Sequence, residues 1–228
     1  MATRLESGPT FVEERAFKKQ GLALVAGVDE AGRGPLAGPV VAAAVILPEG
    51  WLLGSNGRRR RERVRRPESL LNDSKQLTPR QRAMLFDLIA SRAVAYGVGL
   101  VPAGQIDRMG IVPSTRLAMR RAVDCLARRP DALLVDYVDL SEIGLPCRAV
   151  VHGDARCGSI AAASVVAKVS RDRMMEAMDR RYPGYGFARH KGYGTREHLQ
   201  RLRELGPCPI HRRTFGPVRD LLMRPRLL

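Results

Sequence analysis

Near the start of the chain, two short apolar runs flank a turn-rich segment, and this feature restricts the fold more than any other. Residues 22–29 (LALVAGVD) and 39–47 (PVVAAAVIL) have the length of strands, and residues 30–38 between them hold three glycines and Pro35. Glycine and proline between apolar runs favour a tight connection. We therefore predict two neighbouring strands joined by a hairpin-like loop.

Strand-like and helix-like segments alternate after this pair. Thr78, Pro79 and Gln81 have the capping-box pattern of a helix start, and this helix should end near Arg92. Further strands are predicted at 95–101, 133–138 and 148–152, and further helices at 114–128, at 159–181 and from Thr195 to a stop at Gly206 and Pro207. This order predicts a mixed α/β sheet flanked by helices, with a helical C-terminal part over about residues 182–228.

The charge of the chain favours a polyanionic partner. Its 228 residues include 39 basic and 23 acidic ones, for a formal net charge of +16. Binding of basic side chains to phosphates releases condensed counterions, which favours nucleic acid. The alternative is a basic surface without a partner. A hydrophobic content of 45% indicates that the bulk of the chain folds around one sizeable core.

Cysteine usage and hydropathy indicate an intracellular setting. The four cysteines include no C-x-x-C pair, so their spacing does not resemble a zinc site. Residues 1–20 lack the apolar stretch of a secretory leader, and no run approaches the roughly 20 apolar residues of a membrane helix. We expect a cytoplasmic protein with free thiols and no membrane association.

Two segments fall outside the regular pattern. Residues 1–20 carry few apolar anchors, and although helical periodicity is possible around residues 11–19, we predict a flexible N-terminal arm before a folded domain at 21–228. Residues 54–66 form a basic loop with seven arginines between Arg58 and Arg66, which should be solvated. This loop is either an additional phosphate contact or a tolerated surface insertion.

Asp29 and Glu30 form an acidic pair where the first apolar run ends. Like charges repel, and nothing in an apolar core offsets that repulsion. A divalent cation would remove the cost by using both side chains as hard oxygen ligands. The alternative is an ordinary solvated pair of acids in a turn.

Two further acids, Asp136 and Asp154, favour the interpretation as a metal site. Asp136 interrupts the apolar run ALLVDYV, and a strand interior rarely holds an unpaired carboxylate. Asp154 follows a short predicted strand, although a simple turn acid is the alternative there. Asp139 is better interpreted as a loop residue, and Asp172 as a surface residue paired with arginines. Four carboxylates, three of them at strand ends, would suit phosphodiester hydrolysis with two metal ions.

Five linked motifs in this sequence resemble ribonuclease HII, a prokaryotic type 2 ribonuclease H family. They occupy residues 27–40 (GVDEAGRGPLAGPV), 72–77 (NDSKQL), 160–172 (IAAASVVAKVSRD), 190–195 (HKGYGT) and 209–213 (PIHRR). Their order along the chain agrees with the family pattern over most of its length.

The resemblance implies a ribonuclease H-like fold, a mixed five-stranded sheet flanked by helices with a helical C-terminal extension. It implies an endonuclease that cuts the RNA strand of RNA–DNA hybrids and incises at single ribonucleotides in duplex DNA. Its cofactor would be Mn²⁺ or Mg²⁺, its products would carry 5′-phosphate and 3′-hydroxyl ends, and we expect a monomer. Residues 21–228 would then be the catalytic domain.

The resemblance also assigns residues. It implies that the catalytic, metal-binding acids are Asp29, Glu30, Asp136 and Asp154. The family's Gly-Arg-Gly element falls on Gly32, Arg33 and Gly34, and its stacking tyrosine falls on Tyr193. Candidate phosphate contacts are Lys75, Lys168 and Lys191, although a lone lysine is more often a plain surface residue. His190, His198 and His211 suggest a general base, but packing in turns and caps is the preferred interpretation.

Two rival functions stay open at this point. A ribonuclease HIII-like hydrolase would share the acids, but it carries an extra N-terminal domain that twenty residues cannot form. A non-catalytic nucleic-acid-binding protein would use the charge alone. Such a protein has no need of acids at strand ends, which would weaken its contact with phosphates.

Overall fold

A mixed sheet organises the chain in this computed structural model, which describes residues 8–52, 71 and 77–223. Within that part, five strands run in the order β3-β2-β1-β4-β5. They are β1 (Val25–Ala31), β2 (Val40–Ile46), β3 (Ala95–Val101), β4 (Ala132–Asp136) and β5 (Cys147–Val150). The first three pair antiparallel, whereas β4 pairs parallel with both β1 and β5. The predicted mixed sheet with its opening hairpin is confirmed.

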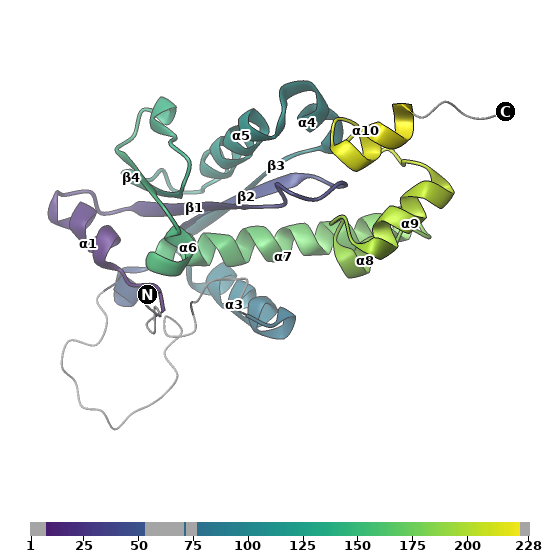
Figure 1. Cartoon of the computed structure of the whole chain (residues 1–228). Helices are drawn as coiled ribbons and strands as arrows, with labels where there is room; N and C mark the ends of the chain where they lie inside the picture. Colours follow the sequence, from purple (N-terminus) through teal and green to yellow (C-terminus); the bar gives the residue numbers. More distant parts are fainter. Residues whose placement is uncertain (1–7, 53–70, 72–76, 224–228) are drawn as a thin grey trace, which may run out of the picture.

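Helices cover both faces of this sheet (Figure 1). One face carries α4 (Ala103–Met109) and α5 (Ile111–Asp124), and the other carries α3 (Pro79–Arg92) and the long helix α7 (Gly158–Arg181). The capping box of Thr78 and Gln81 is present at the start of α3, as predicted. Helix α4 was not predicted, and α5 begins and ends earlier than the expected 114–128.

Alternation along the strands builds a core on each side of the sheet. In β2 every residue is buried; Ala43 and Val45 pack with α7, whereas Ala44 and Ile46 pack with the α5 side. Successive strand residues point to opposite faces, so a strand buried on both faces is apolar throughout. The run VVAAAVI is therefore the central strand of a layered fold.

Helix α7 lies unusually close to β1. A Cβ atom added at Gly27 would stand 2.1 Å from the backbone carbon of Ser159, so only glycine fits there. The small residues at the start of α7 (GSIAAAS) permit this approach. Because Gly27 and Asp29 share a strand face, the same contact brings Asp29 against α7.

The N-terminal segment is attached more firmly than expected. Helix α1 (Val12–Lys19) follows Phe11, and both Phe11 and Phe17 are buried. The backbone of Thr10 pairs with the residues on either side of Cys157, just before α7: its N–H donates to the carbonyl of Arg156, and its carbonyl accepts from the N–H of Gly158, the first residue of α7, each at 2.9 Å. The expectation of a flexible arm is therefore wrong for residues 10–20, because apolar anchors and ladder-type hydrogen bonds hold them.

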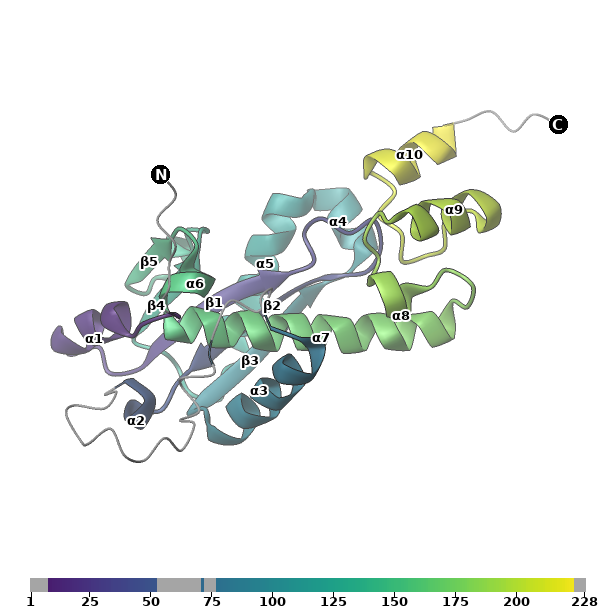
Figure 2. The ribbon, with the colours of Figure 1, turned by 60° about the horizontal axis from the view of Figure 1, so that its bottom comes forward.

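The described C-terminal residues gather at the far end of α7 (Figure 2). They form α8 (Phe187–His190), α9 (Arg196–Leu205) and α10 (Gly216–Met223). Thr195 caps α9 and Gly206 ends it, as predicted, but α10 follows, so α9 is not the last helix. Short elements complete the chain: α2 (Glu49–Leu52), the 3-10 helix η2 (Ser141–Ile143) and α6 (Gly153–Arg156).

The basic loop 54–66 and Lys75 lie outside the described residues. In the described ranges, no helix combines the length and the apolarity that crossing a membrane requires.

Candidate active site

The acids of β1 and β4 meet where these two parallel neighbours end. Asp29 and Glu30 lie near the end of β1, just past its last residue paired with β4, and Asp136 is the final residue of β4. They face a cavity of about 240 Å³. The lining residues are Asp29, Glu30, Ala31, Gly32, Arg33, Gly34, Asp136, Ser164, Lys168 and Tyr193. Eight of the eleven residues proposed from the sequence are in this list, so the structure brings most of them together.

Asp29 is the most buried acid of the cavity, at 4% exposure. Its Oδ1 accepts a hydrogen bond of 2.6 Å from the Glu30 N–H, and the Ser164 hydroxyl on α7 also bonds to its carboxylate. Burial, then the charges of Glu30 and Asp136, raise the pKa of Asp29 well above its ordinary value. The negative charges thus oppose one another, and the site favours a cation or a proton among them.

Glu30 has one satisfied oxygen and one that lacks a partner. Oε1 pairs with Arg33 at 3.3 Å, whereas Oε2 is buried and has no hydrogen-bond partner. Burial raises the pKa of Glu30, and Asp136 adds to the rise against the opposing effect of Arg33. A buried acceptor without a partner is costly, so this oxygen is suited to an incoming cation.

Asp136 and Asp154 are linked through one turn. The Asp136 Oδ1 accepts a 2.7 Å hydrogen bond from the N–H of Gly153, the residue before Asp154 in α6. Asp154 is buried at 4% exposure but does not line the cavity. In residues 8–52, 71 and 77–223, no three acidic, histidine or cysteine side chains are grouped closely enough to hold a metal. The oxygen donors and the orphaned Glu30 Oε2 nevertheless fit a hard divalent cation chemically.

The two glycines of the Gly-Arg-Gly element have different reasons to be glycine. Gly32 has φ of +93°, and a Cβ there would stand 2.0 Å from Arg171 Nε, so the fold itself requires it. Gly34 would place its Cβ in open space. Internal packing therefore accounts for glycine at position 32, whereas no contact among the described residues accounts for it at position 34.

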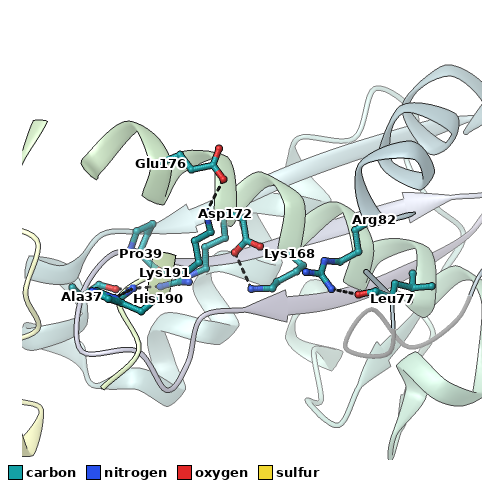
Figure 3. Close-up of polar contacts among 11 residues, drawn as sticks. Ala37, Pro39, Leu77, Arg82, Lys168, Asp172, Glu176, His190 and Lys191 are labelled. Carbon is teal, nitrogen blue, oxygen red and sulfur yellow. Dashed lines mark hydrogen bonds and ion pairs between the residues drawn. The ribbon is translucent and has the colours of Figure 1, made fainter. Parts of the chain in front are cut away.

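The basic side chains assigned to phosphate are mostly paired with acids. Lys168 lines the cavity and pairs with Asp172 at 2.8 Å, and Lys191 lies outside it, paired with Glu176 at 2.6 Å (Figure 3). The expected pairing of Asp172 with arginines is wrong, because the residue one helical turn earlier on α7 is Lys168. Arg33, 41% exposed, pairs with Glu30.

Tyr193 lies beside these cations. The residue is 44% exposed, and Lys168 Nζ and Arg171 Cζ each lie 5.9 Å from the centroid of its ring. The Tyr193 carbonyl is bonded by His198 Nδ1 at 2.9 Å. An exposed ring on a fixed backbone is available to stack on a sugar or base.

The histidines form a buried cluster behind Tyr193, as the sequence suggested. His198 Nε2 and His211 Nε2 lie 3.1 Å apart, and His211 Nδ1 accepts from the Cys208 N–H at 2.9 Å. The rings of His190 and His198 stack at 4.4 Å. Burial lowers the pKa of His198. Burial, together with the charge of the neighbouring His198, lowers the pKa of His211 to about 4. These rings support the fold, and none of them lines the cavity.

Sequence reasoning missed Ser164, Arg171 and Arg212. Ser164 is the one hydroxyl in the cavity wall that bonds to an acid, and a polar residue inside the run AAASVVA is a signal for it. Arg171 and Arg212 are both fully buried. Both lie within the motifs at 160–172 and 209–213, but neither motif indicates that these two arginines are buried.

Comparisons with known proteins agree on one family. The family model described as Ribonuclease HII matches residues 26–218. A ribonuclease HII of Dehalococcoides mccartyi is 51% identical over 218 residues, 94% of this chain and 95% of that protein. The crystal structure of ribonuclease H2 from Pyrococcus horikoshii superposes with a TM-score of 0.69 at 30% identity, over 86% of this chain and 96% of that one.

A more distant solved structure shares the fold. The crystal structure of Bst-RNase HIII in complex with Mn²⁺ matches with a TM-score of 0.60 at 19% identity, over 87% of this chain and 69% of that chain. The predicted ribonuclease H-like fold, with its five-stranded mixed sheet, is confirmed by these matches.

Proposed function

Because the chain belongs to the ribonuclease HII family, endoribonucleases that cleave the RNA of RNA–DNA hybrids, we propose that its catalytic site is the acidic cavity between β1 and β4. The catalytic residues are Asp29, Glu30 and Asp136, with Asp154 joining them from α6. The observation that carries this assignment is the buried, partnerless Oε2 of Glu30 beside a second buried carboxylate. The family match favours ribonuclease HII over a ribonuclease HIII-like or a non-catalytic protein.

The acids hold divalent metal, Mn²⁺ or Mg²⁺, in this proposal. A divalent metal held by these acids would supply Lewis-acid chemistry, which activates water and stabilises the leaving oxygen of a phosphodiester. The protein keeps the ligands in place: Ser164 and the Glu30 N–H orient Asp29, and the Gly153 N–H orients Asp136. Metal binding requires deprotonated carboxylates, which a cation at this site would favour.

Substrate recognition falls to the loop after β1 and to Tyr193. The open space at Gly34 admits the nucleotide, and Arg33 and Lys168 offer cations near its phosphates. The Tyr193 ring stacks at the junction between ribose and deoxyribose, so a single ribonucleotide embedded in DNA is cut as well. Products carry 5′-phosphate and 3′-hydroxyl ends.

A duplex carrying one ribonucleotide tests this proposal directly. We expect a single incision beside the ribonucleotide, dependent on added Mn²⁺ or Mg²⁺, and none in the same duplex made only of DNA. End analysis of the products maps the cut bond. Incision without divalent metal, or equal cutting of the all-DNA control, would overturn the proposal.

A further inference from the structure

Two fully buried arginines hold the loop of residues 32–39 by its carbonyl oxygens. Arg171 lies on α7, and Arg212 follows the turn after α9; both have 0% exposure. Arg212 donates to the carbonyls of Gly32 at 2.6 Å, Arg33 at 2.8 Å and Gly38 at 3.0 Å, and Arg171 donates to those of Pro39 at 3.0 Å and Ala37 at 3.1 Å.

These cations are buried without an acidic partner. Across the described residues, neither guanidinium has a carboxylate within ion-pair distance, and Arg171 Nη1 has no hydrogen-bond partner at all. Burial and the charge of Arg171 lower the pKa of Arg212 to about 9, so Arg212 remains charged at neutral pH. Burying unpaired charge is costly, and apolar side chains would fill the same space without that cost. The arrangement therefore points to a use beyond packing.

Arg212 fixes the orientation of two successive peptide planes. The peptide bonds of residues 32–34 are trans, so each N–H points opposite to the carbonyl of the residue before it. Since Arg212 binds the carbonyls of Gly32 and Arg33, the N–H groups of Arg33 and Gly34 point away from it. Within the described part of the chain, no acceptor is bonded to either N–H. Both residues line the acidic cavity.

We propose that Arg212, supported by Arg171, is a positioning residue for ribose recognition. By binding the carbonyls of residues 32 and 33, it directs the N–H groups of Arg33 and Gly34 at the ribose oxygen of the nucleotide in the cavity. This inference rests on the proposed function, because it places the ribonucleotide beside this loop. Neither arginine touches the substrate.

The physical benefit is a loop that is ordered before the substrate arrives. Residues 32–39 contain three glycines, and ordering such a segment upon binding would consume binding free energy. Five hydrogen bonds from two charged donors remove that freedom in advance. Discrimination between ribose and deoxyribose then depends on the N–H groups of Arg33 and Gly34, whose orientation is fixed before the substrate binds.

Equilibrium binding measures this role separately from catalysis. We would compare Kd for a duplex with one ribonucleotide and for the same all-DNA duplex, without divalent metal, in the parent, Arg212→Lys, Arg212→Ala and Arg213→Ala. Lysine keeps the charge but cannot bind three carbonyls. We expect the preference for the ribonucleotide to fall about tenfold in both Arg212 variants, the worth of one lost hydrogen bond. The exposed neighbour Arg213 controls for lost charge.

The ratio of the two Kd values distinguishes positioning from stability, because a loss of folded protein weakens both duplexes equally. Methylguanidinium should restore the ratio in Arg212→Ala and not in Arg212→Lys. In the unaltered protein, hydrogen exchange at the Arg33 and Gly34 amides should slow only with the ribonucleotide duplex. Unchanged ratios, or equal amide protection by both duplexes, would overturn the inference. If the parent shows no ribonucleotide preference, the proposed function has failed instead.

Discussion

The buried carboxylate of Glu14 accepts two hydrogen bonds from Ser159: one from its N–H at 2.8 Å and one from its hydroxyl at 2.7 Å. Ser159 lies in the first turn of α7, where backbone N–H groups have no partner within the helix. Glu14 therefore caps α7 from another part of the chain. The same helix carries Ser164 and Lys168 to the cavity, so the N-terminal segment supports the site's geometry.

Replacing Glu14 should weaken the fold substantially. Glu14→Ala leaves the Ser159 N–H and hydroxyl buried without their acceptor, and we expect the free energy of unfolding to drop by about 3 kcal/mol. Denaturant titration measures this drop. The control Glu13→Ala removes only a surface pair with Arg148 and should cost less than about 1 kcal/mol. Equal losses in the two variants would contradict a capping role for Glu14.

Asp136→Asn should stop cleavage and leave hybrid binding largely intact. Asparagine keeps the acceptor for the Gly153 N–H but loses the charge proposed to hold metal, so turnover should fall on the order of 1,000-fold or more. Single-turnover assays with Mg²⁺ check this. The matched change Asp139→Asn affects a turn acid that bonds to Ser141 and should leave turnover unchanged. Full activity in Asp136→Asn would refute the catalytic assignment.

The two glycines beside Arg33 should respond differently to alanine. Gly32→Ala forces a side chain into Arg171 at a φ of +93° and should lower the melting temperature by several degrees. Gly34→Ala meets open space, so the protein should melt as the parent does while cutting the ribonucleotide duplex less well. Thermal melts measure the stability of both variants, and initial rates measure their cutting of the ribonucleotide duplex. A Gly34→Ala variant that is stable and cuts at the parent's rate would contradict the proposal that the nucleotide needs the space at this glycine.

Tyr193→Ala should reduce cutting at a single ribonucleotide by about tenfold, since stacking on one aromatic ring is worth roughly 1–3 kcal/mol. Tyr193 is 44% exposed, so the melting temperature should barely change. Tyr96→Ala, with 39% exposure on β3, is the control for loss of a surface ring. A Tyr193 variant with the parent's rate on this duplex contradicts the stacking role.

The histidine cluster predicts a loss of stability in mild acid. The pKa of His211 falls to about 4 in the folded protein, against about 6.5 for an unfolded histidine. The unfolded chain therefore takes up a proton first, and stability present above pH 6.5 is lost as the pH falls toward 4. Asp29 and Glu14 have raised pKa values and act in the opposite direction.

A variant isolates the histidine contribution from those acids. His211→Gln cannot titrate, so its melting temperature should fall less than the parent's between pH 6.5 and pH 4, whatever its absolute value. Melting curves at matched ionic strength give the difference between the two slopes. Parallel slopes would show that His211 does not carry this pH dependence.

Local patterns in the sequence were sufficient for the elements that depend on near neighbours. The apolar runs flanking residues 30–38 predicted the β1–β2 hairpin, and Thr78 with Gln81 predicted the start of α3. Asp29 and Asp136 stood out because a charged residue in an apolar strand breaks a short-range pattern. These predictions succeed because strand alternation and helix caps each depend on residues that lie only a few positions apart in the sequence.

The support of the site depends on partners far apart in the chain. Arg212 and Gly32 are 180 residues apart, and Glu14 and Ser159 are 145 residues apart. No periodicity marks such pairs, so residues 1–20 were predicted to form a flexible arm, and Arg212 was assigned no role although it lies in the motif 209–213. Sequence alone determined which chemistry the acids carry and on which strands they lie. Only the tertiary structure decided what holds them and the loop beside them, because burial turns a lone arginine or glutamate into a fixed hydrogen-bonding partner.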